Sequence, residues 1–96
     1  MDLGHFEWDP KKNRENRQKH GINFTDVVGI FDKPCVEGLD ERFNYGEPRM
    51  IAYGQLGSHV VVVVFCWRKD CRRIISARKA THSESKVYWE IVYGNT

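Results

Sequence analysis

The amino-acid sequence predicts an α+β fold, in which two N-terminal helices precede an antiparallel β-sheet meander and a C-terminal helix follows it. Three observations predict this fold: a helix-capping signal with apolar residues at helical spacing within residues 9–32, an apolar period of two from residue 49, and a second capping signal at residue 81. The chain has 96 residues, 41% of them hydrophobic, which suffices for one core. We therefore expect a single domain over residues 1–96.

The first two elements are a short strand and a polar helix. Residues 5–8 alternate polar and apolar side chains, which predicts a short strand at an edge of the sheet. Asp9 is a good N-cap before Pro10, and Gly21 is a typical stop, so we expect a helix over residues 10–20. This helix has no apolar stripe to bury. It is therefore either held by its ends or covers a partner.

A second helix begins near Asn23, whose side chain can cap it with Asp26 as a weaker partner. Its apolar residues recur at helical spacing and face the core: Phe24, Val27, Val28 and Phe31. The sequence of residues 32–34, Asp-Lys-Pro, ends it. Residues 35–48 contain glycine, proline and scattered acids, which predicts a loop with a short extended piece at residues 35–37.

Three consecutive strands follow as a meander. We expect them over residues 49–55, 59–67 and 72–78, with a tight glycine-first turn at Gly57 and Ser58. The second strand is apolar on both faces and is therefore central. Regular alternation in the third strand gives each face three residues: Ile74, Ser76 and Arg78 on one, Arg73, Ile75 and Ala77 on the other.

The last element is a helix that starts at a full capping box, Thr81 with Glu84. Four residues give this helix an apolar side: Val87, Tyr88, Ile91 and Val92. Gly94 ends it.

The distribution of charge points to an anionic partner. The net charge is +2, but residues 1–48 carry −3 (7 Lys and Arg against 10 Asp and Glu) and residues 49–96 carry +5 (8 against 3). Six cationic residues lie between positions 68 and 79, offset only by Asp70, which indicates a basic patch for an anionic partner. A solvated hairpin is the alternative interpretation, and the charge pattern leaves it open.

The sequence predicts a cytoplasmic protein with no transmembrane helix. Its longest apolar run, residues 60–67, is far shorter than the roughly 20 residues of a membrane span, and the N-terminus lacks the pattern of a secretory signal. The three cysteines, Cys35, Cys66 and Cys71, are odd in number and form no CxxC pair. We expect reduced thiols, with Cys66 buried.

The chemistry that fits these residues needs no cofactor. The sequence has no phosphate-binding loop, no dinucleotide fingerprint and no nucleophile elbow, and its four histidines, His5, His20, His59 and His82, lack metal-ligand spacing. We therefore expect neither a metal nor a cofactor. Cationic and acid–base side chains alone can cleave RNA, because the nucleophile is the 2′-OH of the substrate itself. RNA is thus a sensible anionic partner.

The candidate residues for that chemistry divide by type. His20 is the best proton carrier, since an imidazole ordinarily titrates at about pH 6.5, and Lys19 beside it could hold phosphate. Capping of the helix dipole is the alternative for His20, and a solvated helix terminus is the alternative for Lys19. Glu47 and Arg49 flank Pro48 and could form an acid–base and phosphate pair, or a surface ion pair. Three arginines at strand ends could clamp phosphates: Arg68, Arg73 and Arg78.

Two neighbours of these arginines are assigned other roles. Arg72 precedes Arg73 on the strand and must point to the opposite face, so we expect it to be solvated. Trp67 could stack on a base, but we expect it to pack in the core.

A series of motifs resembles the BrnT toxin family of type II toxin–antitoxin systems. The matching residues keep their order over nearly the whole chain: Phe6-Glu7-Trp8-Asp9-Pro10, Asn16, Lys19-His20-Gly21-Ile22, Phe24, Phe31, Gly46-Glu47-Pro48-Arg49, Arg73-Ile74-Ile75-Ser76-Ala77-Arg78-Lys79-Ala80, Glu84 and Tyr88. The resemblance implies a RelE-like fold, ribonuclease activity and neutralisation by a BrnA antitoxin that carries the DNA-binding, autorepressing part. It also implies a catalytic surface of seven residues: Lys19, His20, Glu47, Arg49, Arg68, Arg73 and Arg78. The chain departs from the family pattern at Pro48 and around His82 and Ser83.

Two functional hypotheses follow. The leading one is a metal-independent endoribonuclease toxin that cleaves RNA, with messenger RNA as the expected substrate, and inhibits translation and growth until a BrnA-like antitoxin neutralises it. The alternative is a non-catalytic module whose basic hairpin binds an acidic protein segment or nucleic acid. Both hypotheses use the same patch, because an antitoxin inhibits most directly by covering the substrate site.

Overall fold

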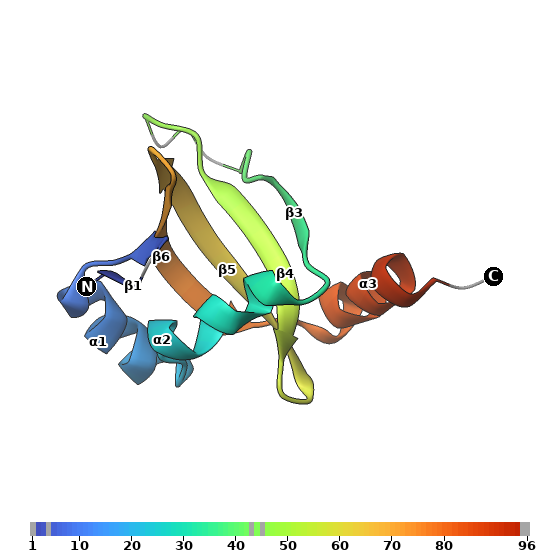
Figure 1. Cartoon of the computed structure of the whole chain (residues 1–96). Coiled ribbons are helices and arrows are strands. Elements are labelled where there is room, and N and C mark those ends of the chain that lie inside the picture. Colours follow the sequence, from blue (N-terminus) through green and yellow to red (C-terminus); the bar gives the residue numbers. More distant parts are fainter. Residues whose placement is uncertain (1, 4, 43, 45, 95–96) are drawn as a thin grey trace.

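The structure is a computed structural model that describes residues 2–3, 5–42, 44 and 46–94. Its elements follow one another along the chain (Figure 1): β1 (Asp2–Leu3), β2 (Phe6–Glu7), α1 (Pro10–His20), α2 (Phe24–Val27), the 3₁₀ helix η1 (Val28–Asp32), β3 (Val36–Leu39), β4 (Met50–Leu56), β5 (His59–Arg68), β6 (Cys71–Lys79) and α3 (His82–Tyr93). The α+β class is confirmed. The antiparallel meander of β4, β5 and β6 is confirmed as well.

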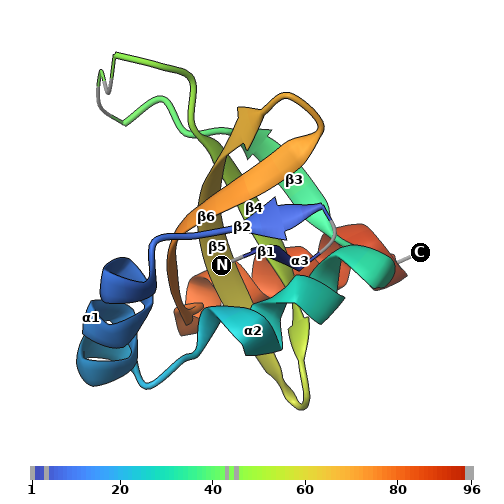
Figure 2. The same ribbon diagram turned by 60° about the vertical axis from the view of Figure 1, so that its left-hand side comes forward.

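The described strands form one six-stranded sheet in the order β1-β2-β6-β5-β4-β3. Strands β2 and β6 run parallel, and the other neighbours are antiparallel. The strand predicted at residues 5–8 is present as β2, but its predicted position at the edge of the sheet is wrong. Strand β2 lies between β6 and β1, because β1 pairs with the side of β2 that faces away from β6 (Figure 2). Strand β5 lies inside the sheet, as its two apolar faces predict.

The core fills the face of the sheet that α2 and η1 cover. Its buried side chains come from the N-terminal segments and from the three long strands: Trp8, Ile22, Phe24, Val27, Ile30, Ala52, Val61, Val63, Phe65, Ile74 and Ala77. Gly54 allows η1 to approach the sheet, since a Cβ atom at this position would lie 2.7 Å from the Cβ of Ile30. A glycine on β4 is therefore required for this packing.

The segment between α1 and β4 is more regular than predicted. The second helix begins at Phe24 as predicted, with Asn23 Oδ1 accepting a hydrogen bond from the Thr25 amide at 3.1 Å. It then tightens into the 3₁₀ helix η1, which ends at Asp32. The extended piece predicted at residues 35–37 is the strand β3, which continues to Leu39.

Helix α1 is held to the sheet by one buried amide rather than by an apolar stripe. Asn16, only 7% exposed, donates from Nδ2 to the carbonyl of Ala77 at 2.8 Å and to that of Ile22 at 3.0 Å. Its Oδ1 accepts from the Ala77 amide at 3.1 Å. The side chain thus pairs with the edge of β6 as a neighbouring strand would. The predicted caps are also present, with Asp9 at the start and Gly21 at a φ of 72° at the end.

Strand β6 contains a bulge that the sequence pattern did not predict. Val64 pairs with Ser76 and Phe65 with Ile74, so Ile75 is the extra residue. The bulge places Ile74 and Ala77 together in the core, although regular alternation would separate them. The two predicted sets of three residues, one for each face, are therefore wrong.

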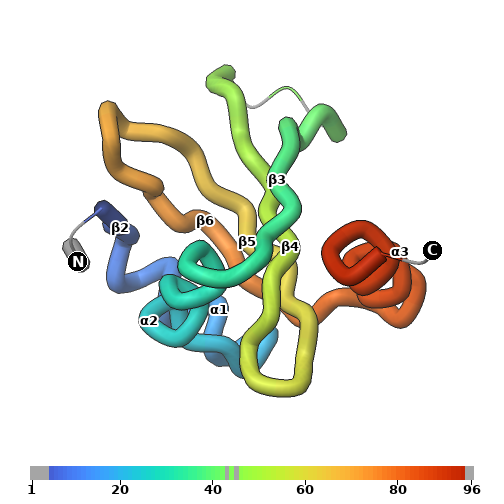
Figure 3. Tube along the Cα trace, turned by 45° about the vertical axis from the view of Figure 1, so that its right-hand side comes forward, coloured from blue at the N-terminus to red at the C-terminus, as the bar shows by residue number. Residues whose placement is uncertain are grey.

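Helix α3 lies on the opposite side of the sheet from α1 and α2 (Figure 3). The predicted capping box is present, because the Glu84 amide donates to Thr81 Oγ1 at 3.2 Å and the Thr81 amide donates to Glu84 Oε1 at 2.8 Å. None of the helices within the described residues is long and apolar enough to cross a membrane.

Candidate functional site

Three of the candidate arginines lie on one face of the sheet. Arg73 pairs with Cys66 and Arg78 with Val62, and residues that pair directly across an antiparallel ladder share a face. Arg68 lies two positions after Cys66 and shares that face as well. We call this side of β5 and β6 the arginine face, defined by Arg68, Arg73 and Arg78. It is the side opposite α2.

Each arginine of this face is paired with a carboxylate from a different part of the chain. Arg68 binds Glu47, which precedes β4, through two hydrogen bonds of 2.6 and 3.2 Å. Arg73 binds Glu7 of β2 at 2.5 Å. Arg78 binds both carboxylate oxygens of Glu84 on α3, at 2.8 and 2.9 Å. The arginine face is therefore tied to three separate elements.

These pairs lower the pKa of every carboxyl group involved. Hydrogen bonds from Arg73 and Arg68 hold the pKa of Glu7 and Glu47, respectively, below the usual 4.5. The two hydrogen bonds from Arg78, together with the capping bond from Thr81, lower the pKa of Glu84 to about 2. All three groups are therefore ionised at neutral pH.

The two ion pairs nearest the β5–β6 turn, Arg68–Glu47 and Arg73–Glu7, both lie beside Cys66. Cys66 Sγ lies 3.3 Å from Nη1 of Arg68 and 3.7 Å from Oε1 of Glu47, and Cys66 pairs across the ladder with Arg73. Burial raises the pKa of the Cys66 thiol, which agrees with its predicted burial and keeps it protonated. Arg49 is half-buried, and its charge adds to the lowering of the Glu47 pKa. The carboxylate of Glu47 is paired with Arg68, which sequence reasoning had not linked to it.

Lys19 and His20 lie at the outer edge of β6. They line a shallow groove of about 160 Å³ together with Lys12, Glu15, Asn16, Ile75 and Ser76. The groove lies beside the middle of β6, because Asn16, which lines the groove, is hydrogen-bonded to the backbone of Ala77. It thus lies between Arg73 and Arg78 along the strand. The structure brings Lys19 and His20 to the flank of the arginine face.

Arg72 and Trp67 lie on the other side of the hairpin and correct two predictions. Arg72 is not solvated: its guanidinium lies over the rings of Phe31 at 4.2 Å and Trp67 at 4.6 Å, and it binds Glu37 at 3.4 Å. Trp67 is not packed in the core, since it is 45% exposed. Sequence reasoning missed this cluster because Glu37 is 35 residues away from Arg72 along the chain.

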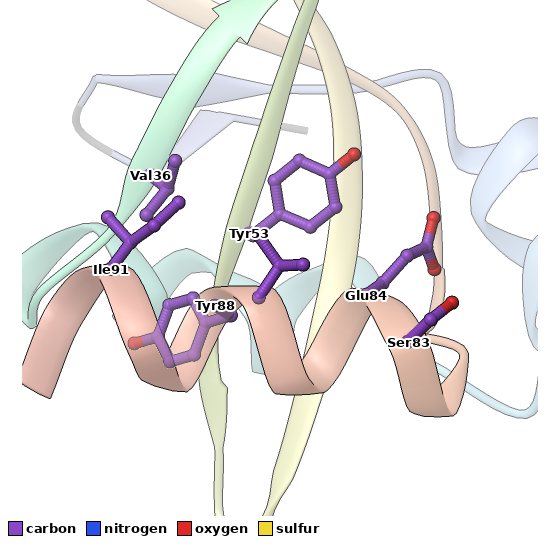
Figure 4. Close-up of a pocket in the computed structure, with 7 residues that line it drawn as sticks. Val36, Tyr53, Ser83, Glu84, Tyr88 and Ile91 are labelled. Atoms are coloured by element: carbon purple, nitrogen blue, oxygen red, sulfur yellow. The ribbon is translucent and has the colours of Figure 1, made fainter. Parts of the chain in front are cut away.

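A second groove separates α3 from the sheet (Figure 4). It has a volume of about 350 Å³ and is lined mostly by apolar side chains: Val36, Tyr53, Ser83, Glu84, Val87, Tyr88 and Ile91. Tyr88 holds the helix in place by donating to the carbonyl of Pro34 at 2.6 Å. Val87 and Ile91, predicted on the apolar side of this helix, are 53% and 60% exposed.

Within the described residues, no group of three or more His, Cys, Asp or Glu side chains is arranged to hold a metal ion. The arginine face and the groove beside it carry guanidinium, ammonium, imidazole and carboxylate groups. Such a set can bind a polyanion, stabilise negative charge and move a proton.

An α+β fold with an arginine-bearing sheet face, flanked by lysine and histidine side chains, has the features expected of a protein that acts on polyanions. The family model for the BrnT ribonuclease toxin of type II toxin–antitoxin systems matches residues 8–84, and the chain belongs to this family. It is accordingly a ribonuclease toxin, with RNA as its target and an antitoxin protein as its partner. No curated protein matches the chain at a significant level.

Proposed function

We propose that the arginine face and the adjoining Lys19–His20 groove form the surface that cleaves RNA, without a metal ion. One observation carries this proposal. The bulge at Ile75 puts Arg73 and Arg78 on the same face, and the groove that holds Lys19 and His20 lies between them. A strand of RNA along β6 would therefore meet a cation on either side of a proton carrier.

In the proposed reaction, the 2′-oxygen of a ribose attacks its own 3′-phosphate. His20 accepts the proton of the 2′-OH, the 2′-oxygen bonds to phosphorus, and the bond from phosphorus to the 5′-oxygen of the next nucleotide breaks. The products are a 2′,3′-cyclic phosphate and a 5′-OH, whose oxygen takes a proton from solvent water as it leaves, and His20 then returns its proton to the solvent. Arg73 and Arg78 stabilise the negative charge that develops on the phosphoryl oxygens, and Lys19 holds a neighbouring phosphate.

Glu47 is assigned a positioning role in this scheme. Both of its carboxylate oxygens accept hydrogen bonds from Arg68, and this pairing lowers its pKa. A carboxylate with a lowered pKa is a weak base, so it is poorly suited to take a proton from a ribose hydroxyl. Its better use is to fix Arg68, with Arg49 beside it, at the entrance of the site.

The ion pair of Arg73 leaves donors free to bind a phosphate. A guanidinium carries five N–H donors, and the described contact of Arg73 with Glu7 uses only Nη1. The rest of the fork can bind a phosphate while Glu7 keeps the side chain in place. Such fixed cations stabilise a transition state better than mobile ones, because they need not reorganise during the reaction.

The antitoxin is proposed to be a BrnA-like protein that carries the DNA-binding function. The toxin itself is proposed to act in the cytoplasm. We propose that the antitoxin covers the arginine face, since a protein that occupies the substrate site inhibits most directly. An acidic segment would match the charge of this face.

The test is to incubate the purified protein with single-stranded RNA in excess EDTA and to analyse the fragment ends. The proposal predicts cleavage that EDTA does not inhibit and fragments that end in 2′,3′-cyclic phosphate. Intact RNA that binds the protein in a salt-dependent manner would instead indicate a non-catalytic binding module. Cleavage that stops in EDTA and returns with a divalent cation would contradict metal independence.

A further inference from the structure

The β5–β6 turn exposes an aromatic side chain beside two cationic residues. Trp67 is the last residue but one of β5, and 45% of its surface is accessible. The residues that follow it are Arg68 and Lys69, and both are exposed. A large exposed aromatic side chain next to cations is typical of sites that bind single-stranded nucleic acid.

Two neighbouring side chains, Arg72 and Phe65, hold the indole ring of Trp67 in a fixed position. The guanidinium of Arg72 lies over it, 4.6 Å from the ring centroid, and Phe65 contacts it edge-on at 5.6 Å and 85°. Because Arg72 covers one face of the indole, the exposed area belongs to the other face and the ring edges. The exposed face is therefore ready to accept a planar group.

The position of Arg72 is itself determined by several contacts. Its guanidinium lies 4.2 Å from the ring centroid of Phe31 and 3.4 Å from the carboxylate of Glu37. These contacts reduce the freedom of Arg72 and hence that of the indole it supports. A platform fixed in this way loses little conformational entropy when a base stacks on it.

We propose that Trp67 is a nucleobase platform, on which a base of the bound RNA stacks while Arg68 and Lys69 hold the adjoining phosphates. This inference rests on the proposed function, because it takes RNA as the ligand of the hairpin. Trp67 and Arg73 lie on opposite faces, so the RNA crosses the end of the hairpin between the platform and the arginine face. The stacked base therefore lies a few nucleotides from the cleaved bond and contributes to binding rather than to the chemical step.

The surroundings of Trp67 distinguish it from the other exposed tryptophan. Trp89 is 37% exposed on α3, and its ring stacks on that of Tyr93 at 5.3 Å. It lies on a different element from the cationic turn, beside Lys86 and Glu90. Trp89 is therefore a matched control for general effects of removing an exposed indole.

Fluorescence can follow the platform directly. In a Trp89→Phe variant the remaining tryptophans are Trp67 and Trp8, and Trp8 is buried at 2% exposure. The probe is a short single-stranded RNA in which every ribose is 2′-O-methylated, so that it cannot be cleaved. Stacking on Trp67 predicts quenching that saturates with the amount of RNA bound.

Substitutions then measure the contribution of the ring. Trp67→Ala is expected to weaken binding of this RNA about 10-fold or more, whereas Trp67→Phe retains most of the affinity and Trp89→Ala changes it little. On unmodified RNA, Trp67→Ala is expected to raise KM and to leave kcat nearly unchanged. Trp67→Phe keeps an aromatic ring in place, so it also tests the proposal if the alanine variant unfolds.

The two proposals fail in different ways. Absent quenching, together with equal RNA affinity of the wild type and both Trp67 variants, would overturn the platform even if the wild type cleaves RNA. Quenching and weakened binding by Trp67→Ala would support the platform even if the wild type leaves unmodified RNA intact, and only the nuclease mechanism would then be wrong.

Discussion

Arg73 and Arg78 project from the same face of β6, although they are separated by an odd number of positions. In a regular strand they would point to opposite faces, and the extra residue at the bulge, Ile75, brings them together. At the usual rise of about 3.3 Å per residue, they lie roughly 15 Å apart along the strand. They therefore flank the Lys19–His20 groove, so a phosphate bound there would lie between the two guanidinium groups.

The first prediction concerns the attachment of α1. Asn16→Ala removes the hydrogen bonds to both backbone groups of Ala77 and leaves them buried without that partner. We expect a loss of about 2–4 kcal/mol in the free energy of unfolding, measured by urea denaturation. Gln18→Ala, on an exposed position of the same helix, should change it by less than about 0.5 kcal/mol. Equal stability of the two variants would show that Asn16 does not hold the helix.

The sequence predicted the secondary structure better than it predicted which face of the sheet each side chain of a strand occupies. Asp9, Gly21 and the capping box at Thr81 are local signals, and the helix boundaries they predict are confirmed. The bulge at Ile75 has no local signal, since Arg72 to Arg78 reads as a regular strand. Its cause lies in long-range packing, which puts both Ile74 and Ala77 into the core.

The candidate site was predictable in composition but not in pairing. The cationic stretch of β6 was evident from charge, and the structure places Arg73 and Arg78 on the face beside Lys19 and His20, whereas Arg72 lies on the other face. The carboxylate partners come from distant positions: Glu7 is 66 residues from Arg73, and Glu47 is 21 residues from Arg68. Such contacts depend on strand order and on parallel pairing between β2 and β6, which a single sequence does not reveal.

The second prediction concerns acid and the docking of α3. The pKa of Glu84 is lowered from 4.5 to about 2 in the folded protein, so its pair with Arg78 stabilises the fold above the unfolded pKa. That contribution is lost as the pH falls from 4.5 towards 2. At pH 7 we expect the free energy of unfolding of the wild type to exceed that of Glu84→Gln by about 1 kcal/mol, after allowance for solvent screening. This difference should shrink steadily as the pH is lowered. A difference that stays constant down to pH 3 would argue against this linkage.

The third prediction separates the two candidate bases. His20→Gln should abolish most of the cleavage, whereas Glu47→Gln should retain more of it, because Glu47 positions Arg68. The pH dependence of the rate distinguishes them further. Since the Glu47 pKa is lowered, a rising limb caused by this residue would lie below pH 4.5. A rising limb at higher pH that disappears in His20→Gln identifies the histidine; the same limb lost only in Glu47→Gln would reverse the assignment.

The fourth prediction concerns the antitoxin. If an acidic or amphipathic segment covers the arginine face or the polar helix α1, the affinity of the toxin for its antitoxin should fall as salt rises. The measurement is the dissociation constant across a series of NaCl concentrations. An affinity that does not change with salt would place the interface instead on exposed apolar residues of α3, such as Trp89 and Ile91.

The most direct test of the arginine face compares the rates of RNA cleavage by variants of its arginines with the rate of a variant whose arginine lies elsewhere. Arg73→Ala and Arg78→Ala each remove a fixed cation, and we expect the single-turnover rate of RNA cleavage in EDTA to fall about 100- to 1,000-fold, or roughly 3–4 kcal/mol. Arg17→Ala is the matched control, because Arg17 lines a different groove of α1, with Asn23 and Asp26. Thermal melting verifies that each variant is folded. Rates for Arg73→Ala and Arg78→Ala that match those of Arg17→Ala and wild type would contradict the assignment of the arginine face as the RNA-cleaving surface.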